Sequence, residues 1–191
     1  ANKYLATFNF RMDGSTKFGE NNKYGYFPSF SLGWNITEED FMSNSAFSLL
    51  KLRGGWGITG NQEIGPKLTQ PLFKTEVNSS VSYPLYLTGD YPPGTFYSRL
   101  ANPDLKWESS KTTNIGFDFG LLNGALTGTV DWFEKVSENI LLSIPPQDPV
   151  QPSASYFANI PGMTIKNSGV ELDLAYRKKL SGNLGIGVGG N

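Results

Sequence analysis

The sequence predicts an all-β fold, an antiparallel meander of about seven long strands. Three observations predict it. Large apolar residues alternate repeatedly with small or polar ones, as they do along a strand with two unlike faces. The alternating segments run about 10–14 residues, whereas strands of soluble proteins average about 5–6. Short connections also alternate with long ones, which is typical of outer-membrane β-barrels.

Composition narrows the class of protein. Charged residues make up 17% of the 191 residues, and the net charge is −1. Nucleic acid is therefore excluded as a partner, because binding to phosphates needs a basic surface. The chain has no Cys and no His, so it lacks thiolate ligands, the commonest metal ligand and the commonest general base. We predict no catalytic, cofactor or metal site, and we expect the protein not to be an enzyme.

The clearest alternation lies in residues Tyr24–Ile36. Its even positions, Pro28 excepted, are large and apolar or aromatic, and its odd positions are mostly small or polar, with Phe27 as the exception. Because proline cannot donate to the hydrogen-bond ladder, we expect a bulge or a local loss of pairing at Pro28. A similar strand is predicted at Lys3–Met12, before a polar loop.

A short helix is predicted after this strand. Thr37 is a candidate N-cap, with Asp40 three residues later, and we expect one or two helical turns. The next alternating segment predicts a strand at about Leu49–Thr59. Residues Asn61–Ser110 then show no sustained period and contain several prolines, so they predict a long external loop.

The second half of the chain repeats the pattern. Strands are predicted at about Thr112–Leu121 and Ala125–Leu142, joined by a tight hairpin at Leu122-Asn123-Gly124. A Pro-rich external loop is expected at about 143–163. A strand at about Thr164–Arg177, a turn at 181–183 and a last strand from Leu184 complete the series.

Two groups of side chains are candidates for a functional role. Charges on the polar faces of the strands line a solute path or pair across neighbouring strands: Lys51, Arg53, Asp118, Glu171, Asp173 and Arg177. Tyrosines of the first long loop either stack on sugar rings or pack the loop itself: Tyr83, Tyr86, Tyr91 and Tyr97. Trp107 is the poorest ligand candidate of this loop.

An ordered series of motifs resembles one family. Lys51–Gln62 looks like the third-strand signature of the SusC/RagA-type TonB-dependent outer-membrane transporters, and Gly25–Ser29 resembles the segment before it. Asn102–Glu108, Asp131–Phe133 and Asn167–Leu172 are similar to the following blocks. Single motifs are weak, but the ordered set covers nearly the whole chain.

The resemblance implies a 22-strand barrel with an N-terminal plug, of which residues 1–191 form a late, partial barrel domain. It implies a Gram-negative, Bacteroidetes-like outer membrane, whose lipid surrounds the barrel. It also implies import of glycans, oligosaccharides or peptides, with a SusD-like surface lipoprotein and with TonB, which acts through the plug region. The inward charges would then line the lumen or contact the plug. A soluble carbohydrate-binding or adhesive β domain is the alternative, since its sheet would alternate in the same way.

Overall fold

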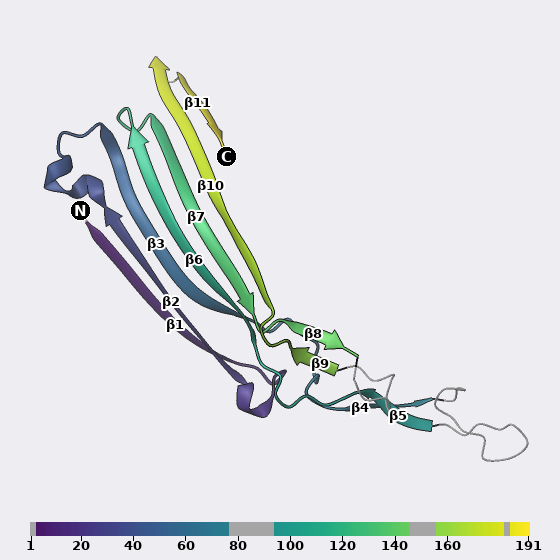
Figure 1. Cartoon of the computed structure of the whole chain (residues 1–191). Coiled ribbons are helices and arrows are strands. Elements are labelled where there is room, and N and C mark those ends of the chain that lie inside the picture. The colour runs from purple at the N-terminus through teal and green to yellow at the C-terminus, as the bar shows by residue number, and fades with distance from the viewer. Residues whose placement is uncertain (1–2, 77–93, 146–155, 182–183) are drawn as a thin grey trace, which may run out of the picture.

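A seven-stranded antiparallel sheet dominates the computed structural model, which describes residues 3–76, 94–145, 156–181 and 184–191 (Figure 1). Its order in space is its order in the chain, so the predicted meander of seven strands is confirmed. The strands are β1 (Tyr4–Gly14), β2 (Tyr24–Asn35), β3 (Phe47–Asn61), β6 (Glu108–Leu121), β7 (Leu126–Glu138), β10 (Thr164–Ser181) and β11 (Leu184–Gly190).

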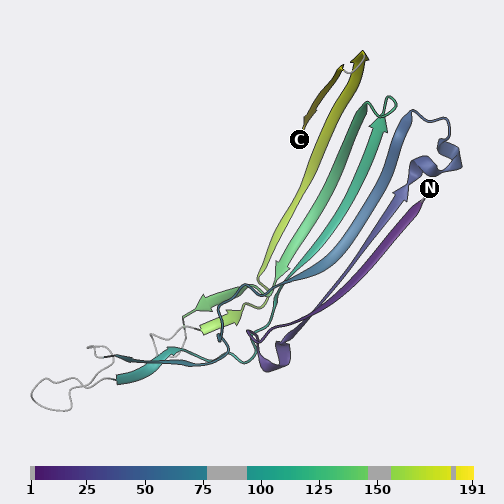
Figure 2. The same cartoon turned by 180° about the vertical axis from the view of Figure 1, so that it is seen from behind.

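The connections fall at two opposite ends of this sheet. At one end lie the short connections, including the β6–β7 hairpin and the 3₁₀ turns η2 (Ile36–Glu38) and η3 (Asp40–Met42) (Figure 1). At the other end lie η1 (Glu20–Asn22) and two hairpins that project beyond the sheet, and the reverse view shows the same division (Figure 2). The predicted asymmetry of short and long connections is therefore present.

The prediction of unbroken loops was wrong in part. The segment 61–110 contains a two-stranded sheet of β4 (Leu72–Glu76) and β5 (Gly94–Arg99). The segment 143–163 overlaps a second one, β8 (Leu141–Ile144) with β9 (Tyr156–Asn159). These strands have four to six residues, too few to show a sustained period, and pairing with a distant segment stabilises them.

The strand predicted over 125–142 is also interrupted. It ends as β7 at Glu138, because Asn139 takes a left-handed conformation with φ of 57° before β8 begins. The predicted hairpin is confirmed: Leu122, Asn123 and Gly124 all have positive φ, and the amide of Gly124 donates to the carbonyl of Leu121 at 3.1 Å. The turn predicted at 181–183 lies mostly outside the described residues.

The predicted helix after β2 was wrong in kind. Thr37 lies inside η2 and is no N-cap; Asn35 and Glu39 precede the two 3₁₀ turns, and neither makes a capping side-chain bond. The chain extends at Glu39 between the two turns, with ψ of 144°, so no continuous helix forms. Among the described residues, no helix is long and apolar enough to cross a membrane.

Pro28 produces no bulge between β1 and β2, where it lies opposite Phe10 in an unbroken register. Pairing of β2 with β3 begins only at Ser29, opposite Gly57. The expected loss of pairing therefore exists on the β3 side alone. A proline is tolerated there because its missing amide hydrogen leaves no donor unpaired.

The sheet has two unlike faces. The outer face is apolar and exposed, with Phe8, Phe30 and Leu32 at 70, 46 and 59%. The inner face carries most of the charges and most of the small residues. Neither face is covered, so the buried core lies elsewhere, at the end of the sheet with the long connections.

This buried core, the loop base, joins three connections. Phe18, Phe27 and Trp107 pack together, with ring centroids of Phe18 and Trp107 4.6 Å apart. The amide of Gly19 donates to the carbonyl of Leu105, which is fully buried. Phe27, the exception in the alternation of β2, is thus a core residue, and so is Trp107, the poorest ligand candidate of its loop.

Two asparagines complete the loop base. The buried Asn102 donates from Nδ2 to the carbonyl of Phe157 and accepts the amide of Asp104 at Oδ1. Asn159 accepts the amide of Lys106 and donates to the carbonyls of Lys106 and Asn139. Amide side chains suit this position because one group donates and accepts at once.

Candidate functional site: a charged row on the inner face

The register of the sheet brings three predicted strands into one charged row. Arg53 of β3 lies opposite Gly116 of β6, and Gly116 lies opposite Asp131 of β7. Asp118 follows two residues after Gly116, on the same face. One arginine and two carboxylates from three strands therefore meet on the inner face.

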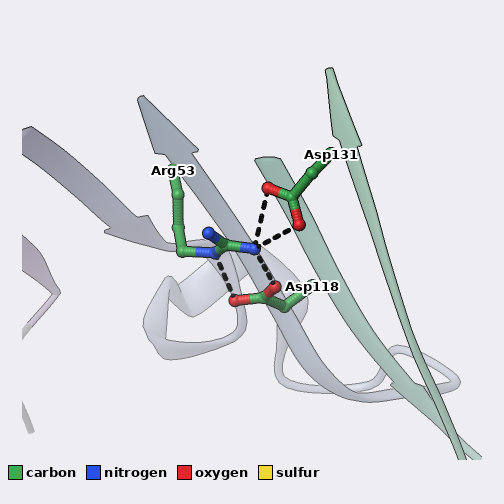
Figure 3. Close-up of polar contacts among 3 residues, drawn as sticks. All are labelled: Arg53, Asp118 and Asp131. Atoms are coloured by element: carbon green, nitrogen blue, oxygen red, sulfur yellow. Dashed lines mark hydrogen bonds and ion pairs between the residues drawn. The ribbon is translucent and has the colours of Figure 1, made fainter. Parts of the chain in front are cut away.

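The arginine bridges both carboxylates (Figure 3). Its Nε and one terminal nitrogen each lie 2.8 Å from an oxygen of Asp118, in a bidentate pair. The same terminal nitrogen lies 3.1 Å from both oxygens of Asp131. The three side chains are 32, 18 and 25% exposed, so water screens the contacts only partly. The triad carries a net charge of −1.

Gly116 makes this geometry accessible. A Cβ atom at position 116 would lie 2.0 Å from Oδ1 of Asp131 and 2.8 Å from the bridging nitrogen of Arg53. The guanidinium therefore crosses over β6 at a position where that strand has no side chain. This is a close approach that a glycine permits and a larger residue does not.

The remaining predicted inward charges lie around this triad. Lys51 is opposite Asp118, Glu171 is opposite Asp131, and Asp173 is opposite Thr129. Arg177 is opposite Gly187 of β11. Within the described part of the chain, none of Lys51, Glu171, Asp173 and Arg177 forms a salt bridge. The prediction of pairing across strands therefore holds for Arg53 and Asp118 only.

A hollow of about 540 Å³ lies beside the triad on the inner face. Asn114, Asp131, Lys135, Asn167 and Glu171 line it, together with Phe133. The lining offers carboxylate, amide and ammonium groups in one shallow surface. It can bind a polar solute or a polar protein surface, but among the described residues no acidic cluster is arranged to hold a metal ion.

Asp131 is the residue that sequence reasoning missed. Alternation already placed it on the polar face of its strand, but it was not included among the candidate charges. The missing signal was the register, because only the pairing of β3, β6 and β7 shows that Arg53 can reach it. Of the predicted tyrosines, Tyr83, Tyr86 and Tyr91 lie outside the described residues. Tyr97 lies on β5, 4.4 Å from the ring of Phe73.

Charged side chains lie on the outer face near both ends of the sheet, and two ion pairs lie at the end with the long connections. Lys111 pairs with Glu138 at 2.7 Å, and Lys166 pairs with Glu134 at 2.5 Å. From these ion pairs toward the short-connection end, the outer face has two apolar rows. The first contains Leu32 and Ile115, and the second contains Tyr4, Trp34 and Leu52. This is the band that a lipid-facing wall needs, bounded by charges where the strands leave it.

Comparison with known proteins agrees with this architecture. A family model described as "TonB dependent receptor-like, beta-barrel" matches residues 1–191. The chain belongs to this family. The TonB-dependent receptor SusC of Bacteroides thetaiotaomicron is 43% identical over 145 residues, which cover 75% of this chain and 14% of that protein. Receptor P39 of Formosa agariphila is 35% identical over 184 residues, or 91% of this chain and 16% of that one.

Solved structures of the family have the same fold. The RagAB peptide importer in its "closed-closed" state matches with a TM-score of 0.75 and 28% identity, covering 93% of this chain and 18% of that one. Its "open-open" state matches equally well. This TonB-dependent receptor chain thus spans about one sixth of the length of its relatives.

Proposed function

We propose that the whole protein is a TonB-dependent outer-membrane transporter that imports glycans, oligosaccharides or peptides. In this proposal, residues 1–191 form seven adjacent strands of the barrel wall. One observation carries it: a seven-stranded antiparallel wall with an apolar outer face, a charged inner face and its projecting hairpins at one end. A soluble domain would have to cover an outer face on which Phe8 and Val170 are 70 and 68% exposed.

Membership of the family supports two proposed partners. TonB would energise the transporter, and a SusD-like lipoprotein would contact the end of the wall that has the projecting hairpins. One structural relative is a peptide importer, which supports peptides as one class of solute. The proposal includes no catalytic activity and no cofactor.

Within the barrel, the charged row would face the lumen. The triad holds Arg53 and Asp131 to each other, while Glu171 remains exposed beside them. We infer that Lys51, Glu171, Asp173 and Arg177 meet either the solute or a plug in the lumen, because water-filled interiors tolerate charges that lipid does not. Tyr97 would lie on the external side, where solute enters.

Uptake by cells tests the transport proposal. A strain that lacks the full-length gene is supplied with labelled oligosaccharides and peptides in turn, and uptake is compared with that of the complemented strain. We expect at least one class to depend on the gene and on TonB. Undiminished uptake of every solute in the deletion strain would contradict the proposal.

The lumen assignment has its own test. Glu171→Gln removes an inner-face charge, and Glu134→Gln removes a carboxylate from the outer face, where it pairs with Lys166. We expect only the first substitution to change the ratio of uptake of cationic to anionic solutes. An equal effect of both substitutions would show that the inner charges are not special to the solute path.

A further inference from the structure

A second hollow of about 540 Å³ lies on the opposite, outer face. It is almost wholly apolar, and its outer-face lining consists of Tyr4, Ala6, Leu32, Trp34, Leu52 and Ile115, with Gly54. Its lining includes the first residues of β1, and β1 begins toward the end of the sheet with the short connections (Figure 1). The proposed transport function does not use this face.

The register explains why the surface is hollow there. Ala6, Leu32, Gly54 and Ile115 form one row across β1, β2, β3 and β6. On β3, Gly54 stands between the large side chains of Leu52 and Trp56, and an added Cβ would meet no atom within 4 Å. The empty volume is therefore built by two small residues among large ones.

A pair of opposite charges, Lys3 and Glu39, lies next to two residues that line the hollow. The hydroxyl of Tyr4 and the Nε1 of Trp34, two residues that line the hollow, both donate to Oε1 of Glu39, at 2.6 and 3.1 Å. The other oxygen of Glu39 lies 3.3 Å from Nζ of Lys3, whose side chain is 38% exposed. Tyr and Trp mark the headgroup level of a bilayer, so this ion pair lies where lipid headgroups lie.

Shape and charge together select the occupant. An apolar hollow on a lipid-facing wall suits an acyl chain, and the Lys3–Glu39 pair beside it offers one ammonium and one carboxylate. A headgroup that carries both a phosphate and an amine complements both, whereas a purely anionic headgroup would meet the carboxylate of Glu39. We propose that this hollow holds one acyl chain of a zwitterionic phospholipid, whose headgroup contacts Lys3 and Glu39.

The lipid site rests on the proposed placement of the chain in the outer membrane. Fluorescence quenching tests the lipid site and the membrane placement separately. The full-length receptor is reconstituted in vesicles of phosphatidylethanolamine and phosphatidylglycerol, with bromine on the acyl chains of one lipid at a time. Subtracting the emission of Trp34→Phe isolates Trp34, which lines the hollow. Subtracting that of Trp132→Phe isolates Trp132, which lies on the same face but outside it.

Quenching of both tryptophans shows that the outer face meets lipid; no quenching of either would overturn the membrane placement itself. We expect brominated phosphatidylethanolamine to quench Trp34 roughly fivefold more strongly than brominated phosphatidylglycerol does. This factor is the effect of one favourable charge at a membrane surface. Trp132 is expected to show no preference. Equal preference at the two tryptophans would overturn the lipid site and leave the membrane placement intact.

A groove-filling variant gives an independent readout. Gly54→Leu places a side chain in the open space of the hollow, and we expect it to abolish the lipid preference of Trp34. The matched control is Thr113→Leu, an apolar enlargement on the outer face one strand away and outside the hollow. A preference that survives Gly54→Leu would contradict the acyl-chain site.

Discussion

Single residues decide whether the charged row can form, and Gly116 is the clearest case. Three strands contribute to the triad, but only the missing side chain of the middle strand allows the guanidinium to reach the far carboxylate. A charge-assisted hydrogen bond contributes about 1.5–3 kcal/mol when well formed, and partial exposure reduces this.

Gly116→Ala is therefore expected to break the contact of Arg53 with Asp131 and to lower the free energy of unfolding by about 1–2 kcal/mol. Gly33→Ala, in the same row, is the matched control, since its added Cβ would lie in ordinary contact, 3.4 Å from Lys51. Denaturant titration of the reconstituted receptor measures both. Equal losses of unfolding free energy from the two substitutions would show that the passage of Arg53 over Gly116 does not contribute to stability.

Glu39 predicts a dependence of stability on pH. Hydrogen bonds from Tyr4, then from Trp34, hold the pKa of its carboxyl below the usual glutamate range. A lowered pKa in the folded state means that the charged form favours folding. This contribution is fully present above the ordinary pKa of about 4.3 and is lost as the pH falls through the folded-state value.

We expect Glu39→Gln to flatten the stability profile between the ordinary glutamate pKa and the lower folded-state pKa. Glu38→Gln is the control, because it changes the neighbouring residue and leaves the bonds of Glu39 in place. The folded fraction is measured between neutral pH and about pH 3, below the ordinary pKa. Identical profiles for wild type and Glu39→Gln would refute this assignment.

At the scale of elements, the loop base fixes how the connections leave the sheet. Asn102, Asn159 and the Phe18–Trp107 contact join segments that are distant in the chain. Gly19 is the tightest point, where an added Cβ would lie 1.7 Å from the carbonyl oxygen of Pro103. Because that neighbour is backbone, the loops would have to separate.

Gly19→Ala is expected to destabilise the loop base by about 1–3 kcal/mol, the usual cost of overpacking. The readout is faster proteolysis of the long connections, with the sheet itself still folded. Gly65→Ala lies on the same side of the molecule and would meet only ordinary contacts of 3.7 Å, so it serves as the control. Proteolysis at the wild-type rate in Gly19→Ala would count against a rigid loop base.

For the whole molecule, the two faces of the sheet predict opposite tolerance to charge. Leu32 points outward and Ser31, its neighbour, points inward. Leu32→Arg should cost up to about 2–4 kcal/mol, because it places a charge on the apolar outer face, and Ser31→Arg should cost much less. Folding yield in lipid vesicles measures the difference. Equal tolerance of the two substitutions would contradict a lipid-facing outer surface.

The sequence predicted the long strands well and the short ones poorly. Alternation over ten or more residues, as in Tyr24–Asn35, is a strong local signal, because successive side chains must point to opposite faces. The hairpin strand Leu72–Glu76 has no such signal; it exists because Gly94–Arg99 pairs with it. The two turns around Glu39 were predicted as one helix for a related reason, since local capping residues do not reveal an extended residue between them.

The sequence alone determined which residues share a face, the polarity of each face and the family resemblance, all of which follow from the two-residue period and from local order along the chain. Only the tertiary structure decided which side chains meet. Arg53 faces Gly116 and reaches Asp131, and Asn102 joins the loops, because strand register is set by pairing between distant segments. The period is a property of each strand, and the register is a property of the sheet.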